Sequence, residues 1–265
     1  MNTDVKQFLD SLVKKYETPD FIKDDPVQFP HRFSDNADIE ISGLISSCLA
    51  YGKRTKIIED VDIVHKLMNN KPAEFVRNFD YERDLKYFLD FRHRYTAGTD
   101  VALLIHVIGQ VLSEYDSLEN VFMTNYSDDD INIKPALTGF VNILKSFIPD
   151  NIENFSGLNY LLPSPEKGSA CKRLNLFLKW MVRSGPVDLN IWKKVSTDKL
   201  IMPLDIHVSK LSRKLNLTAR KPDDWKTAEE ITENLKMFDP NDPVKYDFAI
   251  FGLGITGDSK IINIT

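Results

Sequence analysis

Residues 161–185 read LLPSPEKGSACKRLNLFLKWMVRSG, and this stretch shows most clearly how the chain is built. Proline and glycine residues between 162 and 168 predict a turn, because both residue types interrupt regular structure. The residues that follow carry apolar side chains at helical spacing, namely Ala170, Leu174, Phe177, Leu178 and Met181. The stretch therefore predicts a turn that leads directly into an amphipathic helix.

The same helical spacing extends outward over nearly the whole sequence. It is clearest in residues 41–49, 57–68, 101–112, 208–215 and 228–238. Alternation of apolar and polar residues, which strands would require, is almost absent. The breaks, such as DDPVQFP, SDDD and DPNDP, carry helix stop and start signals and are too short for flexible linkers. We predict an all-α fold of about ten to twelve helices over residues 1–265.

Composition places the chain among globular proteins that do not enter a membrane. Its 265 residues are 42% hydrophobic and 11% aromatic, which is ordinary for a domain with a substantial core. No stretch approaches the roughly 20 apolar residues that a membrane span needs. The opening MNTDVKQFLD lacks the apolar segment of a secretory signal. We therefore expect a cytoplasmic protein without a membrane partner.

Cysteine and histidine usage argues against metal chemistry. The two cysteines, Cys48 and Cys171, stand in apolar helical patterns, which indicates buried thiols and not a disulfide framework. The five histidines are scattered without the spacing of metal ligands. We expect no metal site, no iron–sulfur cluster and no other cofactor.

Charge is distributed unevenly along the chain. The net charge is −5, yet residues 166–221 hold thirteen Lys and Arg against four Asp and Glu. That segment alone carries +9, which leaves −14 for the remainder. Such asymmetry is typical of a surface that binds a polyanion. Charge runs also occur on ordinary solvated helix faces, so charge alone does not decide the function.

Two positions stand out as chemical candidates. Lys172 shares one side of the predicted helix with Lys179 and Arg183, close to a turn whose backbone N–H groups can approach a phosphate. Asp205 stands directly before a second predicted helix at 206–215, where aspartate is a preferred capping residue. A capping role alone would explain Asp205.

The stretch PLDIHVSKLSRKLNL (203–217) is similar to a motif of the helix-hairpin-helix (HhH-GPD) DNA glycosylases, in which an aspartate after a proline and an apolar residue precedes a helix. ADIEISGLISSCLAYGKRT (37–55) and VKYDFAIFGLG (244–254) resemble the superfamily in the same order. The long separation of Lys172 and Asp205 is most similar to that of the archaeal 8-oxoguanine glycosylases. The resemblance implies a two-lobed helical fold with residues 162–221 as its hairpin-like and catalytic segment.

The resemblance also implies a reaction, the removal of a damaged base, such as an oxidised purine, from double-stranded DNA. The damaged nucleotide would be flipped into a pocket. Lys172 would attack the sugar carbon as a neutral amine and form a Schiff base, which gives abasic-site (AP) lyase activity. Asp205 would stabilise positive charge on the sugar or assist proton transfer. Lys179 is the competing nucleophile, and a Lys172 that only contacts phosphate stays open.

The residues expected to contact DNA surround this pair. They are Lys167, Gly168, Ser169, Arg173, Lys179, His207 and Lys210, together with Lys53 and Arg54 in an earlier loop. Ordinary cations at a helix terminus would also explain Lys53 and Arg54. Trp180 and Trp192 are more typical of a core than of base stacking.

Other functions remain open at this point. The cluster FRHRY at 91–95 suits nucleic acid and equally suits a solvated helix end. A catalytically inactive helical protein that binds nucleic acid on the same scaffold is the main alternative, because fold does not determine function. A regulatory module that binds another protein through the acidic N-terminal half is a third.

Overall fold

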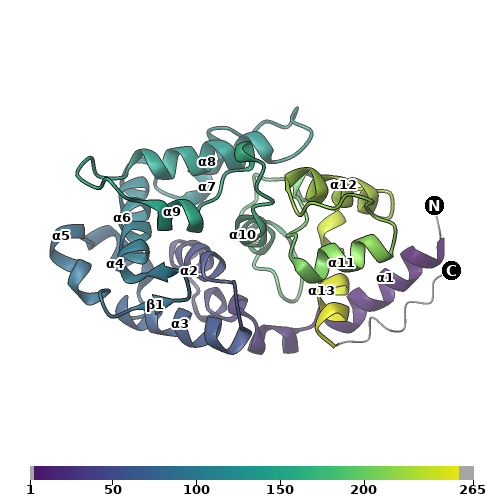
Figure 1. Cartoon of the computed structure of the whole chain (residues 1–265), viewed down its shortest axis with the longest axis horizontal. Coiled ribbons are helices and arrows are strands. Elements are labelled where there is room, and N and C mark those ends of the chain that lie inside the picture. The colour runs from purple at the N-terminus through teal and green to yellow at the C-terminus, as the bar shows by residue number, and fades with distance from the viewer. Residues whose placement is uncertain (1–2, 257–265) are drawn as a thin grey trace. The chain divides into compact units, whose positions relative to one another are not determined.

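The computed structural model describes residues 3–256, and helices dominate this part of the chain (Figure 1). Its α-helices are α1 (Thr3–Tyr16), α2 (Asn36–Cys48), α3 (Arg54–Leu67), α4 (Pro72–Asn78), α5 (Tyr81–Asp84), α6 (Gly98–Tyr115), α7 (Leu118–Met123), α8 (Lys134–Ser146), α9 (Ser156–Leu161), α10 (Lys172–Val182), α11 (Ile206–Lys214), α12 (Trp225–Lys236) and α13 (Tyr246–Thr256). The predicted all-α class is confirmed. The described helices exceed the expected number because α5, α7 and α9 span only one or two turns.

Short elements complete the described chain. Seven 3₁₀ helices are η1 (Pro19–Asp24), η2 (Pro26–Gln28), η3 (Pro30–Arg32), η4 (Leu85–Tyr87), η5 (Pro165–Lys167), η6 (Thr197–Lys199) and η7 (Pro243–Lys245). The strands β1 (Arg92–His93) and β2 (Thr96–Ala97) form a small antiparallel hairpin in which His93 faces Thr96. None of the helices described has the length and apolar character needed to cross a membrane.

The described chain divides into two compact units. Unit 1 comprises residues 3–23, 131–133 and 165–256, and unit 2 comprises residues 24–130 and 134–164. Most of the predicted catalytic segment, from Pro165 onward, therefore belongs to unit 1.

In unit 1, α13 lies between α1 and α11 (Figure 1). Tyr246 of α13 is fully buried, and its hydroxyl donates to Asp10 Oδ1 of α1 at 3.0 Å. A Cβ atom at Gly252 would lie 2.4 Å from the ring of Tyr16, so this close approach of the two helices requires glycine. The α1 helix thus covers one side of α13.

Most residues of the α10 helix are buried. Its predicted apolar face is buried, and Phe177 packs edge-on against Trp192 with ring centroids 5.3 Å apart. Trp180 and Trp192 are each only 1% exposed, so both belong to the core. Cys171 at the start of the helix and Cys48 in unit 2 are both buried thiols, as predicted.

In unit 2, α6 packs against α4, α7, α8 and α9. A Cβ atom at Gly109 of α6 would lie 2.2 Å from the backbone oxygen of Val76 in α4, so glycine permits this contact. Glu40 of α2 is buried, and its carboxylate accepts hydrogen bonds from the backbone N–H groups of Leu118 and Glu119. This carboxylate satisfies the first N–H groups of α7, which have no partner within the helix.

His65 of α3 is a fully buried histidine in unit 2. Its ring contacts Val61 O at 2.8 Å through Nδ1 and Ser42 Oγ at 2.7 Å through Nε2, and it stacks on Phe29. Burial lowers the pKa of His65 to about 4. His65 is therefore neutral, with Nδ1–H donating to the carbonyl and Nε2 accepting from the serine.

Candidate functional site

Lys172 is the first residue of α10, and a tight turn delivers the chain to it. Gly168 has φ +81° and Cys171 has φ +47°, so the backbone turns twice through the left-handed region within four residues. Ser169 Oγ accepts a hydrogen bond from the N–H of Cys171 at 3.2 Å. The predicted turn and helix are confirmed, and the side chain of Lys172 is half-buried.

Asp205 is the N-cap of α11. Its Oδ1 accepts hydrogen bonds from the backbone N–H groups of His207 and Val208, both at 2.8 Å. The predicted capping role is thereby confirmed. The carboxylate is half-buried and stands where the partial positive charge of a helix N-terminus stabilises an anion.

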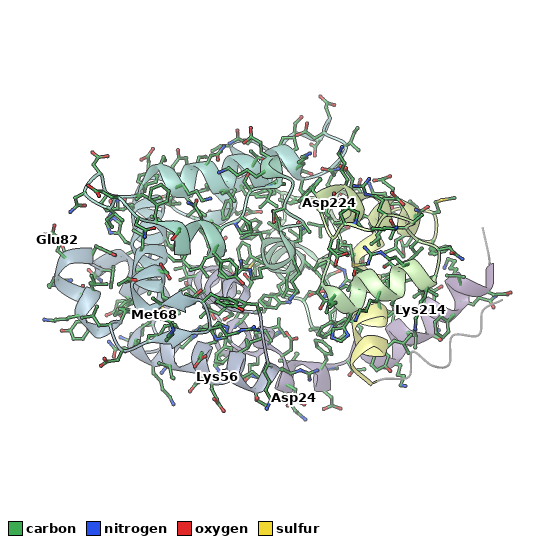
Figure 2. All side chains as sticks on the ribbon, in the orientation of Figure 1. Asp24, Lys56, Met68, Glu82, Lys214 and Asp224 are labelled. Carbon is green, nitrogen blue, oxygen red and sulfur yellow. The ribbon has the colours of Figure 1, made fainter. Side chains whose placement is uncertain are left out.

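One short segment contacts the surroundings of both residues. Asp224, labelled in Figure 2, forms an isolated antiparallel bridge with Ser169, and the N–H of Trp225 donates to Gly168 O at 3.0 Å. The preceding residue, Asp223, accepts a hydrogen bond from Ser209 of α11 at 3.2 Å. Ser209 lies one helical turn after Asp205, to whose backbone oxygen its N–H donates.

Arg213 of α11 adds to the same connection. Its Nη2 donates to Asp223 Oδ1 at 2.7 Å and its Nε donates to Arg220 O, also at 2.7 Å. The segment that contains Asp223 and Asp224 therefore fixes the turn before Lys172 and the helix that Asp205 begins. Sequence reasoning did not single out Ser209, Arg213, Asp223 or Asp224. An aspartate before the predicted helix at Trp225 is nevertheless a recognisable cap signal.

Lys179 does not lie on an exposed basic face, which corrects the expectation for this residue. It is 1% exposed, and its Nζ donates to Asp247 Oδ2 of α13 at 2.8 Å. The same ammonium lies 3.5 Å from the centre of the Phe248 ring. Helical spacing placed Lys179 beside Lys172, but the carboxylate of Asp247 allows the lysine to be buried.

Arg183 is buried in the same region, at the end of α10. Its guanidinium donates to Asp242 at 2.8 to 3.0 Å, to Glu17 at 3.0 Å and to Asp188. Burial raises the pKa of Asp188 to about 6, against the opposing charges of Lys179 and Arg183. The predicted basic side of the helix is thus mostly an internal ion network, and Lys172 alone of its three cations reaches the surface.

The remaining predicted DNA contacts have different environments. Lys167, Gly168, His207 and Lys210 are exposed, and Ser169 is half-buried. Arg173 is only 9% exposed, so its predicted contact with DNA is not supported by its position. Lys53 is exposed and Arg54 is half-buried. Both belong to unit 2, whereas Lys172 belongs to unit 1.

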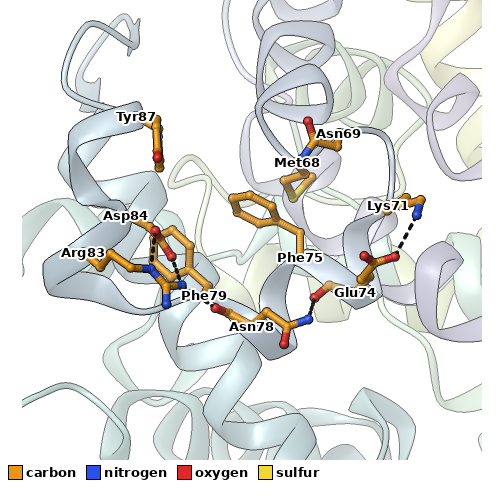
Figure 3. A pocket seen from close by; sticks show the side chains of 10 residues that line it. All are labelled: Met68, Asn69, Lys71, Glu74, Phe75, Asn78, Phe79, Arg83, Asp84 and Tyr87. Atoms are coloured by element: carbon orange, nitrogen blue, oxygen red, sulfur yellow. Dashed lines mark hydrogen bonds and ion pairs between the residues drawn. The ribbon is translucent and has the colours of Figure 1, made fainter.

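A surface pocket occurs in unit 2, between the ends of α3, α4 and α5 (Figure 3). Phe75 faces the gap between Met68 and Tyr87. The charged side chains that line the pocket are paired with one another, Lys71 with Glu74 at 2.9 Å and Arg83 with Asp84 at 2.6 Å. The pocket therefore combines apolar side chains with charged side chains that neutralise one another. None of the predicted site residues lines it.

Metal-binding side chains do not converge in the part of the chain described. Residues 3–256 contain no group of three or more His, Cys, Asp or Glu side chains that could hold a metal ion. The candidate site in unit 1 therefore consists of Lys172, Asp205 and the exposed cations on the same two helices and their connecting turns.

Comparisons with known proteins correct the family expected from the sequence. No curated protein and no solved structure matches the chain. One family model matches residues 25–256, and its description is "Protein of unknown function (DUF2400)". The HhH-GPD glycosylase assignment is wrong, because no model of that superfamily matches. An aspartate cap before an amphipathic helix is a general solution to unsatisfied N–H groups, so the short motif was not specific to one family. The chain belongs to the DUF2400 family.

Proposed function

We propose that this protein is a DNA repair glycosylase with associated AP lyase activity. One observation carries the proposal: a surface lysine begins α10, an anionic cap begins α11, and the segment of Asp223 and Asp224 contacts the surroundings of both. An amine nucleophile and a carboxylate are the minimum set for Schiff-base chemistry on a sugar.

Lys172 is the nucleophile in this proposal, and Lys179 is excluded. The amine of Lys179 donates to Asp247 and is shielded from solvent, so its lone pair is unavailable and no substrate can reach it. Lys172 is half-buried at the N-terminus of α10, so part of its side chain is accessible to a substrate.

The reaction begins with a damaged nucleotide turned out of the duplex, since an enzyme cannot otherwise reach the sugar carbon. The neutral amine of Lys172 forms a bond to C1′ while the bond from C1′ to the base breaks, and the base leaves with the electron pair and gains a proton. Opening of the sugar ring yields a Schiff base between Lys172 and C1′. Elimination then breaks the bond from C3′ to its phosphate oxygen, which nicks the strand.

Asp205 contributes charge in this scheme. Positive charge develops on the sugar as the base departs, and a fixed carboxylate stabilises it without reorganisation. The two N–H groups that donate to Oδ1 hold the carboxylate in place. Capping and catalysis are therefore compatible roles for one side chain.

Exposed cations on the same unit supply the contacts with the DNA backbone. Lys167 lies in the turn before Lys172, and Lys210 lies one turn into α11 beyond Asp205. Lysines of this kind position a duplex through phosphates and make binding weaker as salt increases.

Borohydride trapping on duplex DNA that contains 8-oxoguanine or an abasic site tests the proposal. The wild-type protein is expected to form a covalent adduct, and Lys172→Ala is expected to lose it. Lys167→Ala removes another exposed lysine from the same turn and is expected to retain the adduct. Asp205→Asn preserves the cap but removes the charge, so we expect slower base removal at unchanged stability.

Asp35→Asn is the matched control for the cap. Asp35 caps α2 of unit 2 in the same way, by accepting from two backbone N–H groups, and this variant should keep full activity. An adduct that persists in Lys172→Ala would overturn the assignment of the nucleophile. Binding of duplex DNA without adduct or cleavage would favour the inactive nucleic-acid-binding protein instead.

A further inference from the structure

Three tyrosines from separate segments of unit 2 meet on one surface. The ring of Tyr160 packs edge-on against Tyr51, with centroids 5.2 Å apart, and against Tyr95, with centroids 6.3 Å apart. Tyr95 is 70% exposed and Tyr160 is 41% exposed. We call Tyr51, Tyr95 and Tyr160 the tyrosine platform. Two large aromatic rings held in contact with each other and open to solvent are an unusual use of apolar surface.

The platform is built on a fixed support. The hydroxyl of Tyr51 donates to His93 O at 2.8 Å, and the His93 ring bonds back to Tyr51 O through Nε2 at 3.0 Å and to Asp60 through Nδ1 at 2.7 Å. Both ring nitrogens of His93 are therefore engaged within the fold. This buried network anchors the hairpin of β1 and β2, and the turn of that hairpin presents Arg94 and Tyr95 to solvent.

Cations surround the platform. The Arg94 guanidinium lies over the Tyr95 ring at 5.3 Å, and its side chain crosses Gly52 so closely that a Cβ atom there would be 2.7 Å from Arg94 Cδ. Lys53 and Arg92 are also exposed, and they belong to the segments that carry Tyr51 and Tyr95.

The three segments themselves carry only positive charge, and two acidic side chains beside them, Asp60 and Asp100, accept hydrogen bonds from His93 and from the N–H of Ala97. Residues 51–54, 92–97 and 156–161, which carry the three tyrosines, contain four Lys and Arg and no Asp or Glu. Within the described chain, the structure shows no ion pair for Lys53, Arg54, Arg92 or Arg94. The surface is therefore both aromatic and positively charged.

We propose that the tyrosine platform binds unpaired bases of a single-stranded nucleic acid, with a base stacked on Tyr95 and Tyr160 and phosphates held by the surrounding cations. Stacking on aromatic rings within a positively charged surface is the chemistry that holds single strands without reading their sequence. Arginine beside the rings adds a cation–π contribution. The inference extends the DNA partner of the proposed function, but it does not depend on the chemistry of Lys172.

Fluorescence anisotropy with the full chain and labelled oligonucleotides tests this assignment. The probes are short oligothymidylate, the matching oligouridylate, a duplex of the same length and an abasic oligomer with the same phosphates and no bases. We expect the double variant Tyr95→Ala/Tyr160→Ala to bind oligothymidylate roughly tenfold or more weakly. Replacement of both by phenylalanine should preserve binding, because the ring alone carries the stacking.

Tyr87→Ala is the matched control. Tyr87 is 57% exposed in the same unit and also has a cation over its ring, Lys86 at 5.1 Å, so its removal changes the surface equally without touching the platform. Gly52→Ala is expected to weaken binding several-fold because the added Cβ displaces Arg94. The oligothymidylate and oligouridylate arms then tell whether DNA or RNA is preferred.

Several outcomes would overturn the assignment: no binding of any single strand, equal loss in Tyr87→Ala, or equal affinity for the abasic oligomer, which would reduce the surface to a phosphate contact. Lys172→Ala should bind single strands as the wild type does. Absence of the borohydride adduct from the wild-type protein, together with tyrosine-dependent binding of single strands, would refute the proposed glycosylase activity and leave the platform standing.

Discussion

Lys179 of α10 and Asp247 of α13 form a buried ion pair, with Nζ 2.8 Å from Oδ2 and the lysine side chain 1% exposed. Asp188 lies 3.9 Å from the same ammonium and is itself fully buried. Lys179 thus neutralises Asp247 directly and shares Asp188 with Arg183 inside unit 1. This arrangement gives Lys179 a structural role that its helical spacing from Lys172 does not reveal.

Replacement of Lys179 by methionine, which keeps the length of the side chain, is expected to lower the free energy of unfolding by about 3 to 5 kcal/mol. The loss arises because the buried carboxylate of Asp247 would remain without its cation, while Asp188 would keep only that of Arg183. Urea denaturation followed by circular dichroism measures it. Lys210→Met, at an exposed position of α11, should change stability by less than about 0.5 kcal/mol. Equal midpoints for both variants would contradict the assigned role of Lys179.

Two substitutions of Asp205, the cap of α11, distinguish its contribution to stability from its contribution to catalysis. Asp205→Ala removes both hydrogen bonds to the backbone and should cost about 1 kcal/mol, whereas Asp205→Asn should be nearly neutral since asparagine caps equally well. Asp35→Ala at the start of α2 should cost a similar amount. Thermal unfolding compares the four proteins. A large loss of stability in Asp205→Asn would show that the charge itself is structural, and its effect on activity could then not be attributed to catalysis.

Buried His65 makes unit 2 less stable in mild acid. Its pKa in the folded chain, about 4, lies below the ordinary value of 6.5, so the unfolded chain takes up a proton first as the pH falls. The free energy of unfolding should therefore decrease between pH 6.5 and pH 4, by at most about 3 kcal/mol from this residue, and His65 should contribute no pH dependence above that range.

Comparison of variants isolates the contribution of His65 from other groups that titrate in the same range. His65→Gln should show a shallower decline in stability between pH 6.5 and pH 4 than the wild type. His31→Gln, at an exposed position, should follow the wild-type curve. Parallel curves for His65→Gln and the wild type would refute a neutral, buried His65.

Two helical glycines should both resist replacement by alanine. At Gly109 of α6 the new Cβ atom would meet the backbone oxygen of Val76 at 2.2 Å, and backbone cannot move away cheaply. At Gly139 of α8 it would lie 2.6 Å from Asn125 Cβ, an atom that side-chain rotation does not move. We expect Gly109→Ala and Gly139→Ala each to destabilise by about 1 to 3 kcal/mol through overpacking, measured as a fall in Tm. A Tm equal to that of the wild type would contradict the close contact in question.

Helical periodicity predicted the elements well, because an apolar stripe is a local property of the sequence. The turn before Lys172, the cap at Asp205 and the buried tryptophans all follow from neighbouring residues. Two lobes were expected, but which segments form each unit did not follow from the sequence, since that depends on which stripes pack together. Short elements such as α5 were missed because four residues cannot display a helical period.

Side chains of the candidate site were harder to place from the sequence. A lysine at helical spacing points to one side of its helix, but whether that side meets water or a carboxylate is decided by a distant segment. Asp247 lies 68 residues from Lys179, and no local pattern announces the pair. Family resemblance failed for a related reason: short motifs record local solutions such as capping, which unrelated helical proteins share.

The pairing of α1 with α13 has a consequence for how the chain is made. Residues 24–130 and 134–164 leave the ribosome between these two helices and can pack on one another early, while α1 must wait for a partner synthesised after both segments. Closing so long a loop is slow, so docking of α13 against α1 should follow the folding of unit 2. A chain that lacks the first helix would then be rescued by supplying that helix as a separate peptide.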